Sequence, residues 1–540
     1  MMGTEADVAA PATDEAGRLA ALRARLAAPM PDDRPWGWLG PLLVTAFGGW
    51  LRFNRLQIPR AVIFDETYYA KDAWSILQHG VEWNYVPNAN TLILQGHTTG
   101  LWTSCTGARC GEYVVQPEVG KLLIAVGEWL FGLNSYGWRF SSAVFGTLAI
   151  LLICRIARRM TRSTLLGCLA GLLMSLDGLE FVMSRIGILD IFLMFFILAA
   201  FGCLVIDRDK SRARLAEGVA RGAGGDAGPR LGLRKWQLIC GIILGLAVGT
   251  KWIAAWYIVG FGGLTIAWEI GARRAAGLRS FVRGAFREAV WLPLTFIVIP
   301  LVVYTATWSN WLFTSTGYDR NLGQLAGVKT PVLQALYSLY EYHLQAISFG
   351  LGLRTPHPYQ SQPWDWLLIT RPVAFFYEQY SVPVAGPQYY CPAKGCTGLY
   401  WSQEVLAIGT PLIWWSSILA LVFCLGWWLL HRDWRAGAVL LGVVAGWGPW
   451  FPLVTRTKFY YYALEFEPFL ILSIVLCLGL ILGPATASVR RRSIGAGVVG
   501  AYLLAVLIMF WYFYPIFAAK VIPYPDWLSH MWYRIGHGWI

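Results

Sequence analysis

Runs of about twenty apolar residues recur along this 540-residue chain, and they constrain its fold more than any other feature. Each run is long enough for a helix to cross the ~30 Å hydrocarbon core of a bilayer. Hydrophobic residues make up 56% of the chain and charged residues 14%, whereas about a quarter of the residues of a soluble protein are charged. The sequence therefore predicts an all-α polytopic membrane protein.

We expect about 11 transmembrane helices. The predicted spans are 37–57, 136–154, 164–182, 187–206, 236–250, 252–269, 288–306, 405–430, 436–453, 461–483 and 494–516. They divide the chain into a tail (1–36), a first helix (37–57), a loop (58–135), helices 2–7 (136–306), a second loop (307–404), helices 8–11 (405–518) and a C-terminal tail (519–540). The two loops are too long to be simple connectors, and long loops are usually functional.

The net charge of +13 is distributed unevenly. More than half of the basic residues fall in the tail 1–36 and in short segments near 155–162, 207–235, 273–287, 432–435 and 490–492. This is the positive-inside bias, and it predicts a cytoplasmic N-terminus and an extracytoplasmic C-terminus in the cell membrane. It explains the charge without nucleic acid. The chain has no GxxxxGK[ST] motif, which argues against an ATP-driven pump.

Four of the ten cysteines form two pairs of identical spacing, Cys105/Cys110 and Cys391/Cys396, both in segments predicted to be extracytoplasmic. Local disulfides in an oxidising compartment are the favoured interpretation. A zinc site made from all four is the alternative, but no His or further Cys stands at metal-ligand spacing beside either pair. We therefore predict two disulfides and no metal.

Two adjacent acidic residues, Asp65 and Glu66, follow the first predicted span. Neighbouring side chains do not face the same way on a helix or strand, so one catalytic base with one orienting partner is the sensible division. The simpler alternative for Asp65 is a helix N-cap, because a helical pattern follows it and stops at Gly80. Charged groups close to a membrane are expensive, which favours a functional role.

Several basic residues lie at the predicted outer edge of the spans, against the positive-inside direction. They are Arg139, Arg185, Lys251, Arg456 and Lys458. Such residues commonly extend toward lipid headgroups. Their number on one side instead favours binding of an anionic lipid phosphate, for which Arg offers two forked donors and Lys a point charge.

The chain resembles the protein O-mannosyltransferases in its short bacterial form, a family with the GT-C fold. The resemblance runs from about 37 to 516 and rests on ordered motifs. They are Phe64-Asp65-Glu66, Gln116-Pro117-Glu118-Val119-Gly120-Lys121-Leu122, Gly137-Trp138-Arg139-Phe140-Ser141-Ser142-Ala143, Ser184-Arg185-Ile186-Gly187-Ile188-Leu189-Asp190, Gly249-Thr250-Lys251-Trp252, His357-Pro358-Tyr359-Gln360-Ser361-Gln362-Pro363-Trp364 and Arg456-Thr457-Lys458-Phe459-Tyr460-Tyr461. Fungal members usually have His-Pro-Pro where this chain has Gln116-Pro117-Glu118, and His where it has Tyr68.

The resemblance implies transfer of mannose, with inversion, from polyprenyl-phosphate-mannose to Ser or Thr hydroxyls of exported proteins. Asp65 is then the base and Glu66 its orienting partner, with Arg139, Lys251 and Arg456 on the donor phosphate and Lys458 and Arg185 in reserve. It also suggests substrate contacts for His357, Tyr359, Gln116 and Lys121. The phosphate is an activated leaving group, so no metal, nucleotide or other cofactor is required. The predicted partners are the donor lipid, the polypeptide acceptor, membrane lipids and the protein export channel.

Two other functions remain open from the sequence. A GT-C transferase could move a lipid-linked sugar to a lipid or glycan, and the shape of the acceptor channel would distinguish it. A secondary transporter is disfavoured, because the chain has no detectable repeat and its functional charges cluster at the outer edge of the spans rather than near the midplane.

Overall fold

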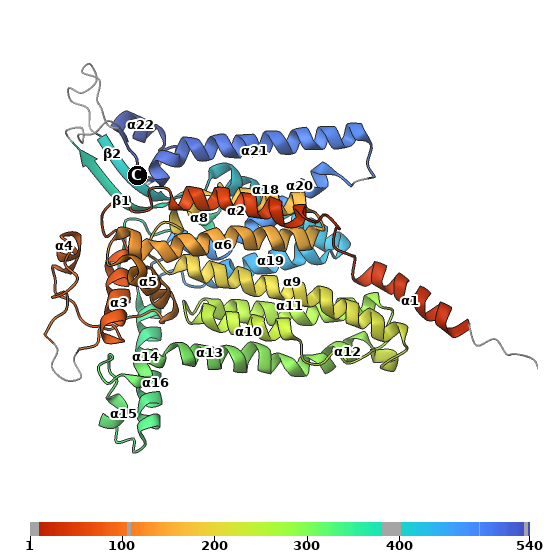
Figure 1. Cartoon of the computed structure of the whole chain (residues 1–540), viewed down its shortest axis with the longest axis horizontal. Coiled ribbons are helices and arrows are strands. Elements are labelled where there is room, and N and C mark those ends of the chain that lie inside the picture. The colour runs from red at the N-terminus through yellow and green to blue at the C-terminus, as the bar shows by residue number, and fades with distance from the viewer. Residues whose placement is uncertain (1–9, 105–109, 381–400, 485, 534–537, 540) are drawn as a thin grey trace, which may run out of the picture.

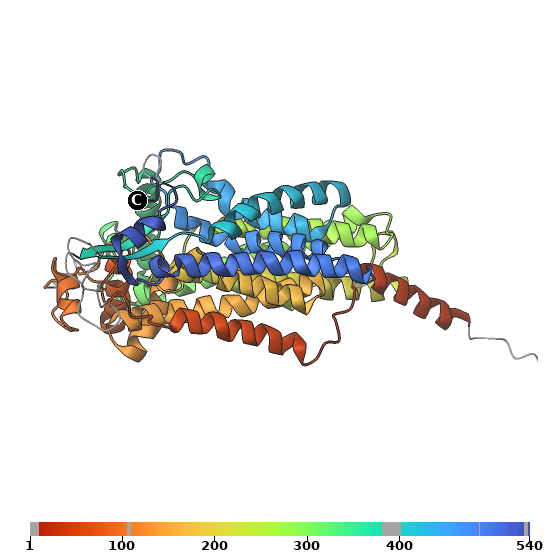
Figure 2. The same cartoon turned by 90° about the horizontal axis from the view of Figure 1, so that it is seen from above.

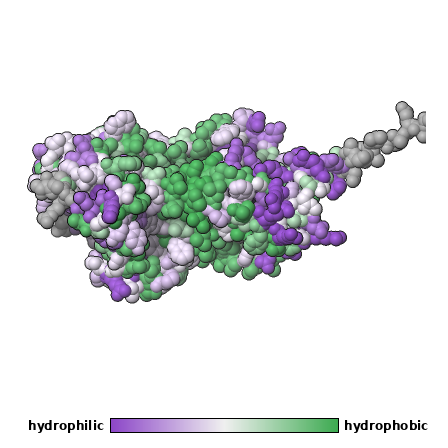
Figure 3. Space-filling view, turned by 90° about the horizontal axis from the view of Figure 1, so that it is seen from below, coloured by the Kyte–Doolittle hydropathy of each residue, from purple (hydrophilic) through white to green (hydrophobic). Residues whose placement is uncertain are grey.

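The computed structural model describes residues 10–104, 110–380, 401–484, 486–533 and 538–539. Most of them are helical, and most of the long helices run side by side along the longest axis of the molecule (Figure 1). A band of hydrophobic residues covers the middle of the face in Figure 3, with polar residues gathered at both ends. This is the surface that a bundle spanning a bilayer requires.

Each predicted span corresponds to an apolar helix or helical segment. They are α2 (Trp36–Phe53), α6 (Ser135–Thr161), α7 (Thr164–Ser175), α9 (Asp190–Ala220), α10 (Lys235–Val248), α11 (Ala254–Ala275), the segment Phe281–Thr307 with α12 (Phe281–Glu288) and α13 (Ile299–Thr307), α18 (Pro411–His431), α19 (Trp434–Trp447), α20 (Glu467–Leu482) and α21 (Val489–Phe517). Six are long and apolar enough to cross a membrane by length and composition, and α7, α10 and α20 are shorter.

The structure corrects some predicted boundaries for local reasons. The span expected at 164–182 is interrupted, because the side chain of Asp177 accepts hydrogen bonds from the backbone N–H groups of Leu179 and Glu180 and starts a separate helix, α8 (Gly178–Met183). The span expected from 405 begins only at Pro411, at the first turn of α18, where proline is tolerated. The preceding residues form a β-strand.

The remaining elements gather at one end of the bundle, and the C-terminal segment lies there too (Figures 1 and 2). They are α3 (Glu66–His79), α4 (Ala89–Leu94), α5 (Val119–Phe131), α14 (Ser309–Phe313), α15 (Leu322–Leu325), α16 (Pro331–Gly352), α17 (Pro363–Trp366), α22 (Tyr524–Ser529) and three strands. The opposite end carries α1 (Ala10–Leu26). The described parts of both long loops and of the C-terminal tail therefore lie at the same end of the bundle.

The three strands form a small antiparallel sheet that an all-α prediction misses. The order is β1 (Val373–Tyr380), β2 (Trp401–Ala407) and β3 (Val521–Pro523), with Val373 opposite Ala407 and Trp401 opposite Pro523. The pairing of β2 with β3 joins the second loop to the segment that follows α21.

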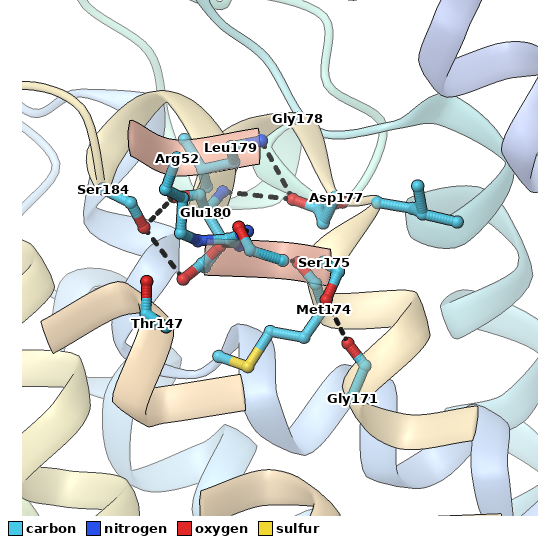
Figure 4. A network of polar contacts seen from close by, with 12 residues as sticks. Arg52, Thr147, Gly171, Met174, Ser175, Asp177, Gly178, Leu179, Glu180 and Ser184 are labelled. Carbon is cyan, nitrogen blue, oxygen red and sulfur yellow. Dashed lines mark hydrogen bonds and ion pairs between the residues drawn. The ribbon is translucent and has the colours of Figure 1, made fainter. Parts of the chain in front are cut away.

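Buried charge is held inside the bundle where α8 meets α2 (Figure 4). Arg52 and Glu180 are both fully buried and form an ion pair, and the hydroxyl of Ser184 donates to Oε1 of Glu180 at 2.9 Å. Close packing is possible because Gly146 has no side chain: a Cβ there would lie 2.0 Å from Oγ of Ser184. Losing one partner of such a pair costs about 3–5 kcal/mol, so the network fixes how α8 sits in the bundle.

Candidate functional site

Asp65 stands at a sharp turn just before α3. The preceding residue, Phe64, has φ 46°, a conformation that a bulky residue adopts at a cost of order 1–3 kcal/mol. Its ring packs against Phe375, Phe459 and Tyr461, with centroids 4.8, 6.1 and 5.9 Å away. These aromatic contacts offset the strain and fix the direction of the next residue.

The carboxylate of Asp65 does not cap the helix. Asp65 occupies the N-cap position of α3, but its side chain makes no capping hydrogen bond. Burial raises its pKa to about 6, as does the charge of Asp190, while Lys251 and a hydrogen bond from Tyr461 lower it. A half-buried carboxylate with a pKa near neutrality is suited to act as a general base.

Glu66 points away from Asp65 and is fully buried against Arg139. Nε of Arg139 donates to Oε1 of Glu66 at 2.7 Å and Nη2 donates to Oε2 at 2.9 Å. Oε1 also accepts from the backbone N–H of Gly187 at 3.0 Å, and Oε2 from that of Ile63 at 3.0 Å. Glu66 therefore anchors the turn that carries Asp65, in keeping with the orienting role.

The guanidinium of Arg139 is fully used in holding this turn and cannot also bind a ligand. It is fully buried, and it also donates to the backbone carbonyls of Leu56, Pro59 and Ala61 at 3.3, 2.9 and 3.1 Å. Because all three guanidinium nitrogens of Arg139 already donate hydrogen bonds, none is left to donate to a lipid phosphate. The structure thus favours a structural role over the phosphate contact expected from the sequence.

Arg185 and Lys458 are occupied in the same way. Arg185 donates to the carbonyls of Arg52 and Asn54, each at 2.7 Å, and so satisfies open carbonyls at the C-terminal end of α2. Lys458 is 1% exposed, and its ammonium donates to the carbonyls of Leu453 and Val454. Neither residue lines the groove described next.

A groove of about 780 Å³ opens between α11, α16 and α19. Its apolar walls include Trp256, Val259, Leu441 and Val444. The lining runs from Trp252, just before α11, to Gly260 in its second turn, and the helical part from Ala254 to Gly260 rises roughly 9 Å at 1.5 Å per residue. The polar end contains Lys251, Arg456, Gln116, Tyr462 and Glu465.

Lys251 and Arg456 are the two cations at the polar end of this groove. Nζ of Lys251 donates to Oδ2 of Asp190 at 2.7 Å, and its side chain is 12% exposed. Nε of Arg456 donates to the carbonyl of Gly350 at 2.7 Å, and its guanidinium lies 5.3 Å from the ring centroid of Trp450. Within the described part of the chain, no neighbour hydrogen-bonds to Nη2 of Arg456, so this nitrogen is free to bind a ligand.

His357 and Tyr359 lie on the aromatic side of the acidic turn. The His357 ring packs edge-on against Phe459 at 4.9 Å and against Phe64 at 6.3 Å. Its Nδ1 accepts from the backbone N–H of Tyr359 at 3.2 Å, and burial lowers its pKa, so it is neutral at pH 7. The Tyr359 ring lies under Arg371 at 5.2 Å. The His357 ring therefore contacts the turn at Phe64, and Tyr359 stands beside His357.

Gln116 and Lys121 belong to one sequence motif, but their side chains lie in different surroundings. Gln116 lines the groove. Lys121 is 1% exposed and pairs with Glu82, with Glu118 at 3.8 Å, among acidic residues of the first loop. The described residues include no group of three or more His, Cys, Asp or Glu arranged to hold a metal ion.

Of the four cysteines predicted to form disulfides, Cys110 is disulfide-bonded. Cys105, Cys391 and Cys396 lie outside the described residues, so the predicted pairings stay predictions.

Sequence reasoning missed several groove residues, among them Trp252, Trp256, Tyr462 and Glu465. Trp252 is the last residue of one quoted motif and Tyr462 directly follows another, which was the available signal. Asp190, the first residue of α9, forms an ion pair with Lys251 just before α11.

Members of one known protein family are similar to this chain over most of its length. The profile of the dolichyl-phosphate-mannose-protein mannosyltransferase family matches residues 42–312, and that of the C-terminal four-transmembrane region of protein-O-mannosyltransferase matches residues 335–535. The polyprenol-phosphate-mannose–protein mannosyltransferase of Mycolicibacterium smegmatis (strain MKD8) is 37% identical over 517 residues, 93% of each chain. That of Corynebacterium glutamicum is 31% identical over 504 residues, 91% of each chain.

The fold agrees as well. A chain of the S. cerevisiae protein O-mannosyltransferase Pmt1-Pmt2 complex, bound to the sugar donor, superposes with a TM-score of 0.69 at 15% identity, over 98% of this chain and 95% of that one. The match in fold extends over nearly the whole length of both chains. The resemblance inferred from the motifs is thereby confirmed, and the chain belongs to the dolichyl-phosphate-mannose-protein mannosyltransferase family.

Proposed function

We propose that this protein transfers mannose from polyprenyl-phosphate-mannose to Ser or Thr hydroxyls of exported polypeptides at the extracytoplasmic face of the membrane. The observation that carries the proposal is the apolar groove, which ends at Lys251 and Arg456 close enough to Asp65 for Lys251 to shift its pKa. The bacterial relatives, which are named polyprenol-phosphate-mannose–protein mannosyltransferases, support the donor and the acceptor class.

In this proposal the groove holds the donor lipid. The polyprenyl chain lies along the apolar walls formed by α11 and α19, and the phosphate lies at Lys251 and Arg456. Arg456 supplies its free Nη2 to a phosphate oxygen, and Lys251 acts as a point charge. Ligand pockets with apolar walls and a few convergent polar groups fix orientation in this way.

The reaction is a single inverting displacement. Asp65 removes the proton of the acceptor hydroxyl, whose oxygen forms a bond to the anomeric carbon on the face opposite the phosphate. The bond between that carbon and the phosphate oxygen breaks, and the phosphate leaves with the electron pair, stabilised by the two cations. Asp65 then loses its proton to water. General base catalysis contributes ~10²–10⁴-fold, and positioning with phosphate stabilisation supplies more.

Glu66 and Arg139 are positioning residues in this scheme. Their buried pair holds the turn at residues 61–66, and the aromatic cluster around Phe64 aims Asp65. His357 and Tyr359 stiffen the same turn from the second loop. The acceptor then approaches across the second loop, on the half-exposed side of Asp65.

The test is mannose transfer by the purified full-length chain, given polyprenyl-phosphate-mannose and a Ser/Thr-rich peptide. We expect mannosylated peptide by mass spectrometry, and none with a peptide in which Ala replaces each Ser and Thr. Consumption of the donor without peptide product, but with a mannosylated lipid or glycan, would contradict the acceptor class and favour the other GT-C activity.

A further inference from the structure

A second cavity lies at the end of the bundle opposite Asp65. It has a volume of about 1050 Å³ and is bordered by α7, α18, α19, α20 and α21. This volume is at the upper end of the ~300–1,000 Å³ typical of ligand pockets. The donor groove shares none of its lining residues, so the two are separate sites.

The inner walls of this cavity are apolar. They include Leu166 of α7, Phe423 of α18 and Leu476 of α20. A smaller crevice of about 500 Å³ between α18, α20 and α21 shares Phe423 and Leu480 with it. The two spaces therefore adjoin and together offer an apolar slot within the membrane-spanning part of the bundle.

The mouth of the cavity carries excess positive charge. Arg162, Arg435 and Arg492 all line it. Arg435 is neutralised by Asp433 at 2.6 Å. Arg162 pairs at 2.9 Å with Asp209, a carboxylate that Arg159 also contacts at 3.0 Å.

Arg492 completes this charge. It is exposed, and its guanidinium forms no ion pair with any residue that the structure describes. Arg162, Arg435 and Arg492 therefore face two carboxylates, one of which is shared. An anion at the mouth would balance the surplus.

We propose that this cavity binds an anionic glycerophospholipid, with its phosphate at Arg492 and Arg162 and an acyl chain in the apolar slot. The chemistry of the site matches both halves of such a molecule: forked guanidinium donors for phosphate oxygens at the membrane surface, and apolar walls below them. In the proposed orientation the mouth faces the cytoplasmic leaflet, where basic segments meet anionic headgroups.

The bound lipid would hold α21 to the rest of the bundle. The cavity lining includes Arg492, Ser493 and Ala496 of α21, facing Leu476 and Gly479 of α20. Lipid in this space would replace missing side-chain contacts between the helices with hydrocarbon packing. We therefore expect it to raise the thermal stability of the protein.

The experiment is native mass spectrometry of the full-length chain in detergent, titrated with phosphatidylglycerol or phosphatidylcholine carrying the same acyl chains. Wild type should retain phosphatidylglycerol about tenfold better than phosphatidylcholine, the difference made by one charge-assisted contact. Arg492→Ala should lose this preference. Arg490→Ala is the matched control, because Arg490 is an exposed arginine of the same helix that does not line the cavity.

A second variant tests the slot itself. Ala496→Trp should fill the cavity and remove the tightly retained lipid copy of either headgroup, without loss of mannosyl transfer. Equal retention of the two lipids by wild type would overturn the proposal, since it indicates a non-selective lipid annulus. An equal preference for phosphatidylglycerol in Arg492→Ala and Arg490→Ala would overturn it as well, because the headgroup would then bind at another site.

Discussion

Nζ of Lys251 lies 2.7 Å from Oδ2 of Asp190, and the pair stands beside Asp65, whose pKa the two residues shift in opposite directions. One cation of the proposed phosphate site is thus already paired with a carboxylate. Arg456, with a free terminal nitrogen, is the stronger candidate for the direct phosphate contact. The pair links the first residue of α9 to the start of α11, so the charge near Asp65 is set by the bundle itself.

Mannosyl transfer should depend on pH through Asp65. The carboxylate must be ionised to accept a proton, and its pKa is raised to about 6, above the usual 3.8. The rate should therefore be constant above about pH 7 and fall about tenfold per unit below about pH 5. Initial rates at saturating donor test this. A rate that stays constant down to about pH 4.5 would contradict the assignment, because a carboxylate with an ordinary pKa would then be the base.

Asp190→Asn should move this pH profile to lower pH. The charge of Asp190 raises the pKa of Asp65, and its removal also leaves Lys251 free to lower that pKa further. Both effects act in the same direction. The measurement is the apparent pKa of kcat/KM for the variant beside wild type, with thermal unfolding in detergent as the control for folding. An unchanged or raised apparent pKa would show that Asp190 does not act on the base.

Arg139→Lys should lower the thermal stability of the protein rather than act on donor binding directly. Lysine keeps the charge but cannot reproduce the bidentate contact with Glu66 together with three backbone carbonyl contacts. Breaking a buried pair of this kind costs about 3–5 kcal/mol, so thermal unfolding should shift to clearly lower temperature. If Arg139 instead bound donor phosphate, the variant would unfold like wild type and show only a raised KM for the donor.

Arg456→Ala should weaken donor binding about tenfold, because it removes one charge-assisted contact to phosphate. The effect should appear in KM for polyprenyl-phosphate-mannose more than in kcat. Arg354→Ala is the matched control, since Arg354 is an exposed arginine of the second loop, next to the contact between Leu353 and Thr457, and does not line the groove. Equal effects of the two substitutions would remove Arg456 from the phosphate site.

The sequence predicted the helical bundle well, because apolar runs of bilayer length have few alternative structures. It could not predict the sheet, whose strands β2 and β3 are separated by four long helices. Pairing between such distant segments leaves no local pattern. Nor could it predict the break at Asp177, where one side chain caps a new helix inside an apolar run.

What the sequence can say about the candidate site is limited for a similar reason. Lys251, Arg456 and Gln116 line the groove, and Asp65, which does not line it, lies near Lys251; the roles assigned to them stay predictions. Arg139 and Arg185 were expected there too, because each basic residue lay at the outer edge of a span. Whether such a residue meets a ligand or the open carbonyls of an interrupted helix depends on tertiary structure alone.

The central claim, that Asp65 is the catalytic base, is tested most directly by Asp65→Asn. The purified variant and wild type are given polyprenyl-phosphate-mannose and the Ser/Thr-rich peptide, and donor binding is measured on the same samples. If Asp65 is the base, Asp65→Asn should bind the donor within about twofold of wild type and lose mannosyl transfer by ~10²–10⁴-fold. Transfer at the wild-type rate, with donor bound, would contradict it, because another group must then accept the proton.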